Sequence, residues 1–145
     1  MGVSATFNYY IDLNSDGDYS DPNEDITAYV MNADWQIGMS AAYDVIARDS
    51  TCRLILKNEN KRFSPENTAG SLHPNFTRGK PVKITATYAG SARTMYTGWI
   101  SSIKPSFGVY GERNTEVDCE GWFARAGGGK SGIELRQSKT TDQVI

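Results

Sequence analysis

The sequence predicts an all-β domain, built as a Greek-key or split β-barrel or as a β-sandwich, with about six to eight strands. Residues 51–57 and 81–88 place apolar side chains at every second position, the spacing of half-buried strands. The 14 glycines and eight tyrosines suit tight turns and strands. A chain of 145 residues is long enough for one hydrophobic core and short for two domains.

The first expected strand covers residues 6–11, with Phe7, Tyr9 and Ile11 on one side. Glycine at position 90 predicts a hairpin turn over residues 89–92, because glycine readily adopts the positive φ of tight turns. Residues 40–49 fit a helical turn and a bent strand equally well, so one short helix between Ser40 and Asp49 is allowed for. The other expected strands or extended segments cover residues 26–30, 34–37, 51–57, 81–88, 94–103 and 114–121.

The connection over residues 58–80 is longer than ~12–15 residues, a length that structureless loops in compact domains seldom exceed. Its apolar side chains Phe63, Leu72 and Phe76 are able to dock on the core, and its prolines restrict the path of the chain by fixing φ. We therefore expect an ordered excursion from the sheet.

The strand pattern ends near residue 126, which predicts a β domain over residues 1–126. Residues 127–132 (Gly-Gly-Gly-Lys-Ser-Gly) predict a flexible linker, and they lack the leading glycine of a phosphate-binding loop. Thr140 or Thr141 followed by an acid and apolar residues predicts the start of a helix. Residues 127–145 are accordingly expected to be a linker and the beginning of a following element, with the chain an N-terminal part of a longer protein.

Charge and composition argue against several functions. The net charge of −2 gives no basic surface for nucleic acid, and no apolar run approaches the ~20 residues of a membrane span. His73 is the single histidine and there is no Cys-x-x-Cys, which argues against a zinc site and most histidine-based catalysis. Cys52 and Cys119 both fall in expected strands, and the sequence leaves open whether they are reduced core residues or a disulfide pair.

An acidic loop follows the first expected strand and matches the first seven positions of an EF-hand calcium loop. Oxygen-bearing side chains alternate there, and Gly17 occupies the position of the sharp turn. The candidate calcium ligands are Asp12, Asn14, Asp16 and Asp18. The twelfth position is Asn23 instead of glutamate, with Glu24 and Asp25 immediately after it. The alternative is a solvated loop in which these side chains accept hydrogen bonds from nearby backbone.

Other residues suited to chemistry carry weaker predictions. Asp118 and Glu120 lie two apart on one strand and fit ordinary surface residues, so no catalytic activity is predicted. Trp35, Trp99 and Trp122 suit a carbohydrate-binding platform, although such aromatics more often lie in cores and interfaces.

Several segments, in order, resemble the first domain of hub-type tail proteins of bacteriophages. The central one is Asn-x-x-x-Arg-Phe-Ser-Pro-Glu-Asn at residues 58–67, followed by Leu-x-Pro at 72–74 and Gly-Lys-Pro-Val-Lys-Ile at 79–84. Upstream lies Asp-Gly-Asp-Tyr-Ser-Asp at 16–21, and downstream lie Tyr-Thr-Gly-Trp-Ile at 96–100 and Val-Asp-Cys-Glu-Gly at 117–121. The resemblance spans residues 7–124.

The resemblance implies a non-catalytic structural protein of the virion, a baseplate hub or tail-tip component assembled in the host cytoplasm. It would join the tail tube to the spike or host-recognition apparatus, and such domains typically form trimeric rings around the tail axis. Candidate interface residues, taken as exposed, are Phe63, Leu72 and Phe76. Two alternatives are a calcium-dependent carbohydrate-binding module and the non-catalytic first domain of a tail-borne hydrolase.

Overall fold

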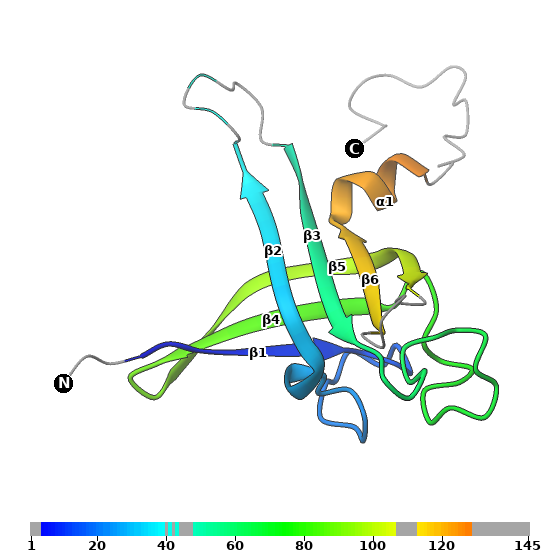
Figure 1. Cartoon of the computed structure of the whole chain (residues 1–145). Helices are drawn as coiled ribbons and strands as arrows, with labels where there is room; N and C mark the ends of the chain where they lie inside the picture. Colours follow the sequence, from blue (N-terminus) through cyan, green and yellow to red (C-terminus); the bar gives the residue numbers. More distant parts are fainter. Residues whose placement is uncertain (1–3, 40, 42, 44–47, 107–112, 129–145) are drawn as a thin grey trace, which may run out of the picture.

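A single sheet of six antiparallel strands curls into a half-barrel in the order β1-β4-β5-β6-β3-β2 (Figure 1). The computed structural model describes residues 4–39, 41, 43, 48–106 and 113–128. The elements are β1 (Thr6–Ile11), the 3₁₀ helix η1 (Thr27–Tyr29), β2 (Val30–Gly38), β3 (Arg48–Lys57), β4 (Pro81–Tyr88), β5 (Ser91–Pro105), β6 (Asn114–Glu120) and α1 (Trp122–Gly128). The predicted all-β class is confirmed.

The strands follow the predicted alternation closely, and β1 and β4 have the expected bounds. The two extended segments expected over residues 26–37 are instead η1 followed by the single strand β2. In the region where a short helix was allowed for, Arg48 and Asp49 begin β3, while residues 40, 42 and 44–47 lie outside the described part. The turn between β4 and β5 consists of Ala89 and Gly90, both with positive φ, as a two-residue hairpin turn requires.

The helix α1 was not predicted, and it occupies residues 122–128, across the expected boundary between barrel and linker. The carboxylate of Asp49 accepts hydrogen bonds from the backbone N–H groups of Phe123 at 3.3 Å and Ala124 at 2.8 Å. The ring of Trp122 lies 6.4 Å from that of Trp99 on β5. Contacts with distant strands therefore stabilise a glycine-containing helix that local propensity alone would not favour.

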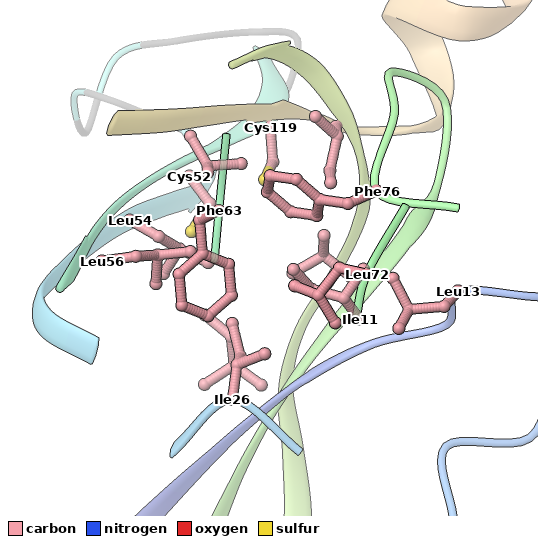
Figure 2. Close-up of a cluster of buried hydrophobic side chains, with 14 of the residues drawn as sticks. Ile11, Leu13, Ile26, Cys52, Leu54, Leu56, Phe63, Leu72, Phe76 and Cys119 are labelled. Atoms are coloured by element: carbon pink, nitrogen blue, oxygen red, sulfur yellow. The ribbon is translucent and has the colours of Figure 1, made fainter. Parts of the chain in front are cut away.

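The core lies against the concave face of the sheet, where β3, β4 and β6 contribute alternate buried side chains and the edge strand β2 contributes only partly buried ones. Figure 2 shows the central part of this cluster. Its members are Ile11, Leu13, Ile26, Cys52, Leu54, Leu56, Phe63, Leu72, Phe76, Val82, Ile84, Tyr96, Ile100, Val117 and Cys119. Cys52 and Cys119 are directly opposite each other on β3 and β6, and both are free thiols. The neighbouring Cys52 thiol and burial raise the pKa of Cys119, so both cysteines serve as small apolar core residues.

The excursion over residues 58–80 packs on this core, as expected. Phe63 is completely buried, and its ring lies 5.3 Å from that of Tyr29 and 5.6 Å from that of Phe76. Leu72 and Phe76 are also buried, each 3% exposed (Figure 2). The expectation that these three apolar residues are exposed interface residues is therefore wrong. Aromatic and leucine side chains in a long polar connection bury more apolar area by closing the core than by facing solvent.

The buried amide of Asn58 fixes the start of the excursion. Its Oδ1 accepts the backbone N–H of Phe63 at 2.9 Å. Its Nδ2 donates to the Ser64 hydroxyl at 2.9 Å and to the Thr115 hydroxyl on β6 at 2.8 Å. The Thr115 hydroxyl in turn donates to the Phe63 carbonyl at 3.1 Å. This closed network attaches the excursion to the sheet without leaving the amide unsatisfied.

The outer edge of β1 is covered by the chain that returns from the acidic loop. The N–H of Ile11 donates to the carbonyl of Glu24 at 2.9 Å, and the N–H of Ile26 donates to the carbonyl of Tyr9 at 2.9 Å. This return segment fixes the two ends of the acidic loop relative to each other. At the opposite end of the sheet, β3 is the single strand that pairs with β2 among the described residues.

Candidate functional site

The acidic loop begins at Asp12, which directly follows β1 and is completely buried. One carboxylate oxygen of Asp12 accepts the Gly17 N–H at 2.9 Å, and the other accepts the Ser15 N–H. Ser15 and Gly17 both have positive φ, at 65° and 87°. The chain therefore turns tightly around the Asp12 carboxylate, which organises the first half of the loop.

Glu24 closes the loop from the other side. Its side chain is 1% exposed, and Oε1 accepts the Leu13 N–H at 2.8 Å. Oε2 is also buried and has no hydrogen-bond donor in bonding geometry. Burial raises the pKa of Glu24, and the negative charge of Asp12 raises it further, while the backbone N–H groups of Leu13 and Asp21 oppose the rise. Two carboxylates thus lie at the buried base of one loop.

The other three predicted ligands form the exposed rim. The Asn14 amide donates to the carboxylates of Asp16 at 3.0 Å and Asp21 at 2.6 Å. The carboxylate of Asp18 accepts the Ser20 hydroxyl at 2.7 Å. This bond and backbone N–H donors lower the pKa of Asp18. The rim side chains therefore bond to other groups of the loop in this structure.

The structure brings the predicted ligands into one loop and shows them in the side-chain-to-backbone turns that were the alternative. In the described ranges no three histidine, cysteine, aspartate or glutamate side chains form a ready metal cluster. Glu24 was noted from the sequence but not counted as a ligand, because an EF-hand loop ends one position earlier. Asp25, the other acid at this point, bonds elsewhere: its carboxylate accepts the Thr27 N–H at 2.9 Å. Calcium binding remains a prediction.

Asp118 belongs to an ion-pair network on the outer face of the sheet. Its carboxylate contacts the Lys104 ammonium at 2.6 Å and the Arg53 guanidinium at 3.2 Å, and accepts the Ser102 hydroxyl at 2.9 Å. Burial alone would raise the pKa of Asp118, but these three donors outweigh it and the pKa lies below its usual range. Partly exposed ion pairs such as these stabilise the folded state only modestly.

Replacing this carboxylate, as Asp118→Asn, is expected to lower the free energy of unfolding by about 1 kcal/mol at pH 7. Because the folded pKa is depressed, the contribution is present above the unfolded value of ~3.9 and is lost as pH falls through the folded pKa. Urea unfolding from pH 7 down to pH ~2.5 checks this. Glu59→Gln, which removes the exposed pair of Glu59 with Lys57, is the control with a smaller effect. A loss for Asp118→Asn that does not shrink at low pH would contradict this interpretation.

The three tryptophans do not form one platform. Trp35 lies opposite Cys52 on the neighbouring strand, and Cys119 lies opposite both Cys52 and Ile100. Residues that lie opposite each other in a sheet share a face, so Trp35 is on the core side with these buried residues. Trp99 precedes Ile100 and therefore faces the other side of the sheet, where the ring of Trp122 meets it. A flat sugar-stacking surface made by all three tryptophans is excluded.

No protein-family model matches the sequence, and no curated protein matches it. Within the described residues, no helix has the length and hydropathy needed to cross a membrane.

Proposed function

We propose that this chain is a structural module of a phage tail, a hub or tail-tip component that joins the tail tube to the spike. Its place would be the virion, and its assembly would occur in the host cytoplasm. The motif order of the resemblance supports the proposal, and each motif occupies a defined place on the fold. The acidic loop follows β1, the long excursion joins β3 to β4, and the two short motifs lie on β5 and at the end of β6.

The observation that carries an assembly role is the outer edge of β2, the last strand of the sheet. Met31, Ile37 and Met39, on or next to this strand, are 57%, 56% and 58% exposed. Free edge strands with apolar side chains pair readily with other chains, and monomeric proteins usually protect them with charge, proline or a covering segment. The occupant we propose is another copy of this chain, because the resembling tail domains form rings.

A closed ring needs two different surfaces on each subunit. The β2 edge supplies one of them. The second is the exposed apolar pair Trp122 and Phe123 on α1, whose side chains are 63% and 68% exposed. Large exposed aromatics of this kind are typical anchors of protein interfaces.

The solution mass of the natural full-length protein, measured by light scattering over a wide concentration range, tests the proposal. We expect the mass of a closed ring of three subunits. We expect the double variant Ile37→Lys/Met39→Lys to have the mass of a monomer. Tyr88→Lys is the matched control, because Tyr88 is 57% exposed at the end of β4 and away from β2. A wild-type monomer at all concentrations, or a ring unaffected by the β2 variant, would refute this assembly.

The carbohydrate-binding alternative receives less support. Trp35 lies on the core side of the sheet, which leaves only the Trp99 and Trp122 pair, with rings 6.4 Å apart, for contact with a sugar. A glycan array with and without calcium distinguishes this alternative from a structural role.

A further inference from the structure

The unpaired Glu24 carboxylate oxygen is the one feature of the acidic loop that the loop's own hydrogen bonds do not explain. A buried charged group without a partner is costly, so native proteins pair such groups or use them as ligands. Oε2 of Glu24 is buried, while Oε1 of the same carboxylate is held at Leu13 within the loop. Because the hydrogen bond from Leu13 fixes Oε1, it also holds Oε2 of the same carboxylate at the base of the loop.

The same base holds the completely buried carboxylate of Asp12. The Glu24 carboxylate lies close to Asp12, because its Oε1 accepts the N–H of Leu13, the residue that directly follows Asp12, at 2.8 Å. Burying two like charges together is unfavourable unless a cation or proton lies between them. Each Asp12 oxygen accepts one N–H and keeps a second lone pair available.

We propose that the loop from Asp12 to Glu24 binds one calcium ion. Asp12 and the free oxygen of Glu24 would hold it from the buried side. The rim residues Asn14, Asp16 and Asp18 would supply the remaining oxygens after turning from their present partners. The inference does not depend on the proposed tail function, because it uses only the geometry of this loop.

Calcium fits this loop better than other cations. The donors are carboxylate and amide oxygens, which hard cations prefer over transition metals. Calcium accepts six to eight oxygens in flexible geometry, whereas magnesium demands near-ideal octahedral geometry. A loop whose last carboxylate comes one residue later than in an EF-hand is compatible with the flexible ion. The proposal therefore includes selectivity for calcium over magnesium.

Tyr19 provides a direct probe of binding. Tyr19 belongs to the loop itself and directly follows the proposed ligand Asp18. Terbium(III) replaces calcium in oxygen sites and emits when a nearby tyrosine transfers energy to it. We expect tyrosine-sensitised terbium emission from the intact chain, removed by calcium at lower concentration than by magnesium. Calorimetry is expected to give one calcium site with a dissociation constant below about 1 mM.

The variant Glu24→Gln tests the role of the unpaired oxygen. The amide keeps an acceptor for the Leu13 N–H but removes the charge, so the fold is expected to remain and calcium affinity to fall at least ~10-fold. Saturating calcium is expected to raise the Tm of the wild type by about 5 °C and that of Glu24→Gln by much less. Asp25→Asn is the matched control, because it removes the adjacent carboxylate that bonds to Thr27, and it should bind as the wild type does.

The absence of a wild-type response to about 10 mM calcium would overturn the proposal, since even weak calcium modules saturate near that concentration. Equal binding by Glu24→Gln and wild type would also overturn it, by placing any bound ion elsewhere. If Glu24→Gln changes only the Tm without calcium, the buried carboxylate serves the fold alone. Far-UV circular dichroism of each variant shows whether it is folded before these results are compared.

Discussion

Phe63→Ala is expected to lower the free energy of unfolding by about 3–5 kcal/mol, a large part of the ~5–15 kcal/mol that holds a typical domain together. Phe63 is completely buried between the sheet and the excursion, with aromatic contacts to Tyr29 and Phe76. Truncation removes the apolar burial of the ring and leaves a cavity that these neighbours only partly fill. Urea unfolding followed by tryptophan fluorescence measures the change.

Phe123→Ala is the matched control, since it deletes the same ring from a side chain that is 68% exposed. Its effect on the unfolding free energy of the monomer is expected to stay within about 0.5 kcal/mol. Similar losses for the two variants would contradict the assignment of Phe63 to the core. The comparison also separates core packing from any role of Phe123 in assembly.

Asn58→Ala is expected to cost about 2–4 kcal/mol, because a 2% exposed amide makes three hydrogen bonds that hold the excursion. The change leaves the Phe63 N–H buried without its acceptor. The loss should be concentrated in the excursion, so hydrogen exchange of the Phe63 amide is expected to accelerate more than exchange in β4.

Asn67→Ala is the control for this effect, because the Asn67 amide makes one exposed hydrogen bond, to the Lys61 carbonyl at 3.0 Å. We expect it to cost less than about 1 kcal/mol. Uniform acceleration of exchange over the whole sheet in Asn58→Ala, without a local excess at Phe63, would show that the network does not act on the excursion specifically.

Strand positions were predictable where the side-chain alternation is local. β1 and β4 followed directly from period-two spacing, and the β4–β5 turn followed from Gly90. The helix α1 was not predictable in this way, because its N-terminal capping residue, Asp49, lies 74 positions from Phe123 in the sequence. Whether such a helix forms depends on tertiary contacts, and the pattern of neighbouring residues in the sequence does not reveal these contacts.

The candidate site was predictable in part for a related reason. The alternation of acids and Gly17 identified the turn that forms around Asp12. The position of Glu24 depends on the return segment that pairs with β1, a contact outside the loop motif. The sequence predicted that Phe63 docks on the core, and Phe63 is buried. The second prediction, that Phe63 is an exposed interface residue, conflicts with this docking.

The place of β6 in the sheet has a consequence for synthesis on the ribosome. β2 with β3 and β4 with β5 form two antiparallel pairs, and β6 is the strand that lies between β3 and β5. As the nascent chain emerges, the two strand pairs cannot join into one sheet until β6, residues 114–120, is released, and their apolar faces are exposed until then. Such late, long-range closure slows folding and exposes intermediates to aggregation. Chaperone demand during translation should therefore end when β6 leaves the exit tunnel.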